Sequence, residues 1–152
     1  MPWLFSLVEY LHVFSAIVAV GFNATYAIWI VRGQRQPEHL EFALKTVKFL
    51  DDRVANPAYA LLLITGLALA VLGHTPLTTH WLLLALVLYV IAVAMGLGLY
   101  TPTLSRQIRA LAASGKDSAE FRALSSRGTV VGISVGIVVA IIVLLMVFQP
   151  AF

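Results

Sequence analysis

The residues of this chain with the clearest chemical potential form a polar stripe inside its first long apolar run. The stripe recurs at spacings of three and four residues and consists of Glu9, His12, Ala16, Ala19, Asn23 and Tyr26. Such spacing places side chains on one face of a helix. Ionisable groups within a bilayer are costly and normally face the inside of a bundle. A neutral imidazole in that position can ligate a metal ion, so His12 is the leading candidate for a functional residue.

Counting depth along the helices predicts which residues share a layer with His12. An α-helix rises about 1.5 Å per residue, so His12 lies roughly 12 Å below the membrane boundary of its run. The same depth on the other apolar runs falls at Thr65-Gly66, Tyr89 and Ala140. Two interpretations remain open. In the first, Thr65 or Tyr89 satisfies a structural, neutral His12 by a hydrogen bond, and the small residues only let the helices approach. In the second, Gly66 and Ala140 leave space beside the imidazole for a flat cofactor.

Glu9 and two further histidines are secondary candidates. Glu9 lies one helical turn before His12, where it orients His12, carries protons or extends to the lipid headgroups. His74 and His80 flank the short loop 75–79. Two imidazoles near a membrane surface are candidate copper or zinc ligands, and the alternative is that both are solvated. The sequence contains no phosphate-binding loop, no nucleophile–base set and no metalloprotease His pair.

Four long apolar runs must position these residues. Of 152 residues, 61% are hydrophobic and 11% are charged, and the mean hydropathy is +0.94. A soluble domain of this length has too little polar surface to enclose so much apolar surface. Each run satisfies the requirement of roughly 20 apolar residues for a bilayer core. We therefore predict an all-α, single-domain membrane protein over residues 1–152. Its four-transmembrane-helix bundle has spans at about 4–31, 54–73, 81–100 and 129–148.

The positions of the charges predict the orientation of the chain. All ten Lys and Arg residues fall in the segments 32–53 and 101–127. Short loops rich in Lys and Arg stay on the cytoplasmic side, so the N-terminus, the C-terminus and the loop 74–80 are expected outside. The basic residues form no dense run, which favours contacts with anionic lipid headgroups and gives no indication of nucleic acid. The lack of Cys excludes disulfides and Cys-ligated metal sites.

The basic segments are expected to be helical. In 38–50 the apolar residues follow helical spacing and the charged residues take the opposite face. This pattern predicts an amphipathic helix that enters the second span through a bend at Asn56-Pro57. The third span is expected to continue past Pro102 until Gly115 ends it. The segment 117–120 is then a capping-box-like start for the last helix.

Small residues on the fourth span predict close helix packing. Gly128, Gly132, Gly136 and Ala140 recur every four residues, and membrane helices associate through close approach of their backbones. The Gly132–Gly136 face packs either within the bundle or against another chain, in a homodimer or a larger membrane complex. The charged run Asp51-Asp52-Arg53 is expected to form an interfacial ion-pair group.

Several motifs resemble those of short bacterial integral membrane proteins of uncharacterised function. The resemblance covers nearly the whole chain and implies a multi-pass protein of the bacterial cytoplasmic (inner) membrane. Its motifs are the segment 9–16 leading to Val20-Gly21, the segments 42–47 and 63–66, and the segment 121–127 before the final span.

The Leu11-His12-Val13 segment is also distantly similar to the first span of copper-resistance D and HemJ-type membrane proteins. The HemJ-type proteins are haem-binding protoporphyrinogen oxidases with an axial His in that span, and only His12 carries over. The basic residue expected on a later HemJ span has no counterpart, since every Lys and Arg here lies outside the predicted membrane cores. The resemblance therefore implies haem or metal handling by His12.

Two function classes follow from these observations. In the first, His12 holds haem b for electron transfer or redox chemistry, Glu9 or Tyr89 fixes the imidazole tautomer, and Thr65 and Gly66 border the cofactor. Because no other His lies within a predicted span, the iron would be five-coordinate, bear a weak sixth ligand or be shared across a dimer. In the second class, the protein is a non-enzymatic membrane subunit, a scaffold or a small oligomeric transporter.

Overall fold

The computed structural model describes residues 2–150, a range built from helices joined by short connections. No strand occurs within this range, and the predicted all-α class is confirmed. Two of the segments, η1 and η2, are π-helical. In chain order the elements are α1 (Pro2–Arg35), α2 (Pro37–Leu50), η1 (Asp51–Ala55), α3 (Asn56–Leu72), α4 (His80–Met95), η2 (Gly96–Tyr100), α5 (Thr101–Ser114) and α6 (Ala119–Phe148).

Four helical rods are long and apolar enough to cross a membrane: α1, α2 through α3, α4 through α5, and α6. They are 30 to 36 residues long, so at about 1.5 Å per residue each exceeds a hydrocarbon core of about 30 Å. Large apolar side chains point outward along them, such as Val71 at 72% and Val90 at 66% exposure. An apolar outer surface of this kind suits lipid tails, and the fold is that of a four-span membrane bundle.

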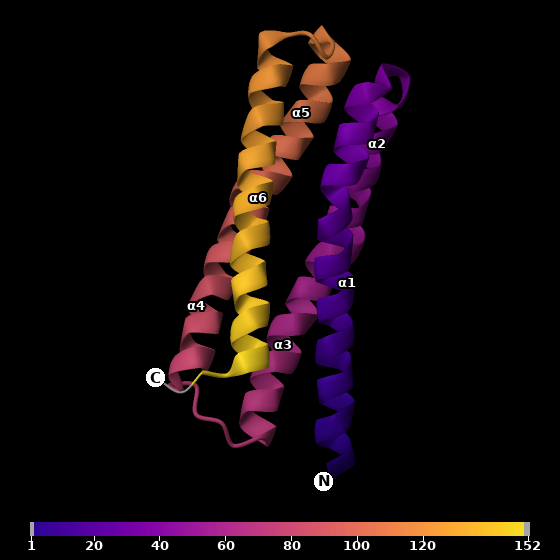
Figure 1. Cartoon of the computed structure of the whole chain (residues 1–152). Coiled ribbons are helices and arrows are strands. Elements are labelled where there is room, and N and C mark those ends of the chain that lie inside the picture. Colours follow the sequence, from indigo (N-terminus) through magenta and orange to yellow (C-terminus); the bar gives the residue numbers. More distant parts are fainter. Residues whose placement is uncertain (1, 151–152) are drawn as a thin grey trace.

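The rods form two helical hairpins (Figure 1). In the first hairpin α1 packs against α2, η1 and α3, and in the second α6 packs against α4, η2 and α5. The α1–α2 and α5–α6 connections lie at one end of the bundle, which we call the basic end because the basic segments 32–53 and 101–127 reach it. The α3–α4 loop, the start of α1 and the end of α6 lie at the opposite end. That the basic end faces the cytoplasm stays a prediction.

Each hairpin contains a rod that is interrupted by a π turn just before a proline. The turn η1 precedes Pro57, and η2 precedes Pro102. Proline has no N–H, and its ring collides with the carbonyl one turn earlier in a regular helix. A π turn widens the helix locally and moves that carbonyl aside, and the backbone N–H of Thr101 bonds to the carbonyl of Gly96, five residues back. The predicted interruption near Pro57 therefore takes the form of a π turn within a continuous rod.

The largest fully buried side chains gather at the basic end. They are Leu40, Leu44 and Val47, and all three lie on the apolar face of the amphipathic helix α2. Helix α1 approaches this face closely at Gly33, where a Cβ atom would lie 2.9 Å from the Cβ of Ala43. The same atom would lie 3.2 Å from the backbone of α2. Only glycine fits there without a shift of the two helices, and the sequence patterns above did not single it out.

The start of α6 is the one predicted. Gly115 takes a positive φ of 76° and ends α5. Ser118 then caps α6, because its hydroxyl oxygen accepts a hydrogen bond of 3.2 Å from the backbone N–H of Phe121. The side chain of Phe121 cannot return a hydrogen bond, so the cap is a single bond and not a full capping box.

The small-residue stripe of α6 divides between two environments. A Cβ atom at Gly132 would lie 3.3 Å from the ring of Tyr100, and one at Gly128 would lie 3.7 Å from Thr103. A Cβ atom at Gly136 would meet nothing within 4 Å, and Ala140 is exposed. The half of the stripe nearer the basic end therefore packs within the second hairpin. Contact of the other half with a second copy stays a prediction.

Candidate functional site

His12 is tied to α3 through one ring nitrogen. Its Nδ1 lies 2.9 Å from the hydroxyl oxygen of Thr65, a buried residue that is 5% exposed. That hydroxyl donates its only hydrogen to the carbonyl of Leu61 at 2.7 Å, so toward His12 it can only accept. We assign the imidazole hydrogen to Nδ1 on this basis, which leaves Nε2 as the unprotonated nitrogen. A hydrogen bond from the other ring nitrogen is the usual way to orient a metal-ligating His.

The imidazole ring of His12 packs directly against Gly66, so the space expected there for a cofactor is absent. A Cβ atom on Gly66 would lie 3.1 Å from Cε1 of His12. Gly66 thus lets the ring pack directly against α3 and leaves no slot for a flat group between them. Ala140, expected to widen the same layer, is exposed and is absent from the described wall of the cavity beside His12. Depth counting placed Gly66 correctly in the layer of His12, where it lets α1 and α3 approach, but misplaced Ala140 because it ignores how each helix is rotated.

Tyr89 and Glu9 are not the partners of His12. The hydroxyl of Tyr89 donates to the backbone carbonyl of Tyr59 at 2.6 Å. Tyr59 in turn accepts a hydrogen bond of 3.0 Å at its phenol oxygen from Asn23 of α1. Glu9 is exposed, and within residues 2–150 no hydrogen bond joins it to His12. Of the predicted alternatives for satisfying His12, Thr65 is correct and Tyr89 is wrong.

A large cavity lies between the two hairpins and brings several predicted site residues onto one surface. Its volume is about 1150 Å³, and its wall is mostly apolar. Glu9, His12, Gly66 and Tyr89 line it, together with residues of the second hairpin on α4 and α6. Among the described residues of the wall, none is Lys or Arg. The inward direction predicted for the polar stripe of α1 is thereby explained, since the stripe faces this cavity.

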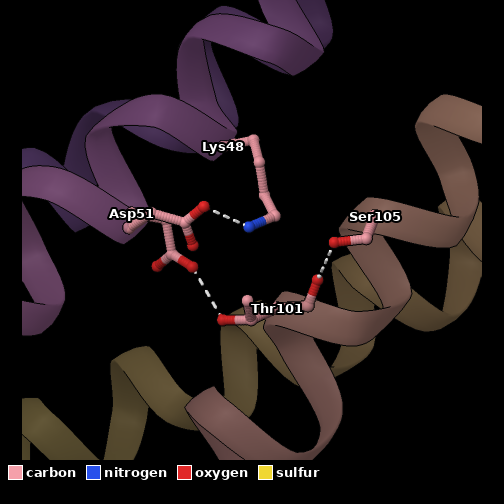
Figure 2. A network of polar contacts seen from close by, with 5 residues as sticks. Lys48, Asp51, Thr101 and Ser105 are labelled. Atoms are coloured by element: carbon pink, nitrogen blue, oxygen red, sulfur yellow. Dashed lines mark hydrogen bonds and ion pairs between the residues drawn. The ribbon is translucent and has the colours of Figure 1, made fainter.

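A second polar group lies where η1 approaches the start of α5, and sequence reasoning missed it (Figure 2). Asp51 of η1 is 5% exposed and accepts a hydrogen bond of 2.7 Å from the hydroxyl of Thr101, the first residue after η2. Asp52 instead pairs with Lys48, one turn away on the exposed side. Arg53 forms no ion pair within the described range. The expected interfacial ion-pair group at 51–53 was therefore wrong for Asp51, which links the hairpins.

The loop histidines remain separate from this site. His74 and His80 are both exposed, and His74 takes a positive φ of 53° at the end of α3. No group of three or more His, Asp or Glu side chains suited to a metal ion occurs in the part of the chain that the structure describes. Copper or zinc binding by this histidine pair stays a prediction. His39 of α2 is exposed as well.

The rods, their lipid-facing apolar surface and the internal cavity define a multi-pass integral membrane protein. Residues 6–150 match the model of the family described as "Predicted integral membrane protein (DUF2269)", and the chain belongs to this family. Searches among curated proteins and among solved structures found no match. The predicted membership in an uncharacterised membrane family is confirmed, and the likeness to copper-resistance D and HemJ-type proteins stays a resemblance.

Proposed function

We propose that the protein binds haem b in the cavity between its hairpins, with Nε2 of His12 as the axial ligand. The observation that carries this proposal is the hydrogen-bond relay from Nδ1 of His12 through Thr65 to the carbonyl of Leu61. The relay holds the ring in the tautomer that a haem iron needs. The distant likeness of the Leu11-His12-Val13 segment to haem-binding membrane proteins supports the same assignment.

The residues present fit such a group in size and in donor type. Ligand pockets typically measure about 300–1,000 Å³, and a cavity of about 1150 Å³ exceeds this range. Because the ring packs on Gly66, the room for a planar group lies on the cavity side of His12. The wall offers only neutral donors, such as Tyr89 and Asn23, for the acidic side chains of a haem. When bound, haem b supplies one-electron chemistry, and this chain supplies the axial imidazole and a largely apolar enclosure.

The membrane setting of the proposed function is the bacterial cytoplasmic membrane, with the basic end inside. The positive-inside rule supports this orientation, and the resemblance to short bacterial membrane proteins supports the location. His12 would then lie in the outer half of the membrane. A homodimer that shares the iron is compatible with the open Gly136 face of α6.

An absorption spectrum tests the proposal directly. Protein purified from cells supplied with haem should show a Soret band that shifts on reduction. His12→Ala should abolish the band, and His39→Ala, which alters an exposed histidine on α2, should leave it intact. Thr65→Val removes the acceptor of Nδ1 and should lower haem affinity by about 10–100-fold, the usual effect of losing a partner that orients a ligand.

A parent protein that stays colourless with haem available, and that cannot take haem up afterwards, would overturn this proposal. His12 would then be a structural histidine satisfied by Thr65. The alternative function class, a non-enzymatic membrane subunit, a scaffold or a small oligomeric transporter, would account for the fold.

A further inference from the structure

Asp51 is a buried carboxylate that forms no ion pair within residues 2–150. It accepts a hydrogen bond from Thr101 and also interacts with the side chain of Asn56. Lys48 is the cation that contributes to its electrostatic environment, but the Lys48 ammonium is bonded to Asp52. Burying a carboxylate is expensive unless it is paired. Neutral donors contact this one, and a cation bound beside it would stabilise its ionised form.

Tyr26 provides a second, independent sign of a ligand. The residue is 4% exposed, and its hydroxyl is the one buried side-chain oxygen or nitrogen in the described range that has no hydrogen-bond partner. A buried phenol oxygen without a partner costs about as much stability as a lost hydrogen bond, and it is free to accept one from an N–H group. The Tyr26 hydroxyl also lies within electrostatic range of Asp51. An unsatisfied phenol beside an unpaired carboxylate indicates that a polar group belongs between them.

Aromatic rings surround this position. Tyr26 of α1 stacks on Tyr100 of η2, with 6.3 Å between ring centroids and 8° between ring planes. Tyr59 of α3 lies within electrostatic range of both Tyr26 and Asp51. Aromatic faces attract ammonium groups, and aromatic cages recognise them in other proteins. All four residues line the cavity between the hairpins.

We propose that the cavity binds an organic cation that has an ammonium head and a hydrocarbon chain. The ammonium head binds to Asp51 and to the tyrosines Tyr26, Tyr59 and Tyr100, and the chain occupies the inter-hairpin cavity. The Asp51 carboxylate supplies the negative charge that attracts the ammonium group. The Tyr26 phenol accepts a hydrogen bond from it, and the aromatic rings enclose it. A metal ion does not suit the site, because hard cations take six or more oxygen ligands and the site offers a single carboxylate. The ammonium site lies about 21 Å along α1 from His12, at about 1.5 Å per residue. Both line the same cavity, but binding of the ammonium group does not depend on haem.

Decylammonium is a suitable probe, because it combines one primary ammonium group with an alkyl chain. Isothermal titration calorimetry would measure its binding to the full chain in nanodiscs of zwitterionic lipid, with empty nanodiscs subtracted. We expect saturable binding, with Asp51→Asn weakening the affinity by about tenfold or more because the charge is removed while the Thr101 hydrogen bond is kept. Glu41→Gln is the matched control. It removes an exposed carboxylate that pairs with Lys45 and leaves the Lys48–Asp52 pair intact, so the affinity should stay unchanged.

Tyr26→Phe gives a second and structurally milder test, since it deletes only the unpartnered hydroxyl. It should weaken decylammonium binding several-fold and leave the ring wall in place, and it decides the question if Asp51→Asn fails to fold. Neutral decanol should not show the Asp51 dependence. Equal affinities for parent and Asp51→Asn would overturn the proposal, as would the absence of saturable binding, with trapped water then satisfying Tyr26. His12→Ala should bind decylammonium normally, which separates this site from the haem proposal.

Discussion

At the basic end, Leu40 and Leu44 are at most 1% exposed, whereas the buried positions around His12 are mostly small, such as Ser15 and Ala19. The contrast follows from the surroundings of each half. Where amphipathic helices such as α2 leave the membrane, water makes burial of large apolar side chains favourable. Among lipid tails that advantage disappears, and helices associate through small residues and hydrogen bonds. The basic end therefore holds the hairpins together, and the membrane half is free to keep a cavity.

The prediction with the largest expected effect concerns which end of the molecule faces the cytoplasm, and cysteine labelling tests it. The chain has no Cys, so single cysteines can replace Gln34 or Ser114 at the basic end and Thr78 in the opposite loop. All three positions are exposed. If the basic end is cytoplasmic, an impermeant maleimide should label intact cells only at Thr78→Cys. The other two variants should react after permeabilisation, and the reverse pattern would invert the orientation.

Truncating a leucine to alanine should lower the free energy of unfolding more at the basic end than in the membrane half. Leu44 is 0% exposed at the basic end, and Leu67 is 38% exposed on the cavity wall. Leu44→Ala should lower the free energy of unfolding by about 2–5 kcal/mol, the usual cost of a buried leucine. Leu67→Ala should cost about 1 kcal/mol or less. Chemical denaturation in mixed micelles measures both, and similar losses would show that the membrane half is packed as tightly as the basic end.

Replacing one glycine in each half by alanine also compares the packing of the two halves, this time by adding a methyl group. Gly33→Ala places a Cβ atom 2.9 Å from that of Ala43 and should destabilise the protein by about 1–3 kcal/mol. Gly136→Ala meets nothing within 4 Å and should be neutral or stabilise by about 0.5–1 kcal/mol through better helix propensity. Melting temperatures in detergent report both changes. A large loss of stability in Gly136→Ala would instead reveal a partner on that face. Size-exclusion chromatography of the variant would then show whether this partner is a second copy of the chain.

The smallest effect concerns the helix cap at the basic end. Ser118→Ala removes the acceptor of the Phe121 backbone N–H and should cost about 1 kcal/mol. Ser126, which is exposed in the same helix, provides the control. Ser126→Ala should leave the melting temperature unchanged or slightly higher. If the two variants behave alike, the start of α6 is held by its packing and not by its cap.

Periodic and local features were predictable from the sequence. The inward stripe of α1, the amphipathic face of α2 and the Ser118 cap depend on residues within a few turns of one another. The pairing of His12 with Thr65 was also predictable, because helices of known rise that start at one membrane boundary reach the same depth after the same number of residues.

Features that depend on helix rotation and register were not predictable in the same way. Gly66 was correctly placed in the layer of His12, but its contact with the ring required knowing how α3 is turned. Tyr89 reaches the same layer and points to Tyr59. Asp51 and Thr101 are far apart in sequence, and nothing in either segment specifies that η1 approaches the start of α5.

The mirrored order of the hairpins has a consequence for biosynthesis. The straight helices α1 and α6 occupy the ends of the chain, and the interrupted rods follow one another in the middle. The first hairpin is complete at Leu72, before α4 leaves the ribosome, and most of its helix contacts are internal. It can thus insert as a finished unit, in keeping with chains that fold part by part during synthesis. The hydrogen bond from Thr101 to Asp51 can then form only after the second hairpin has inserted.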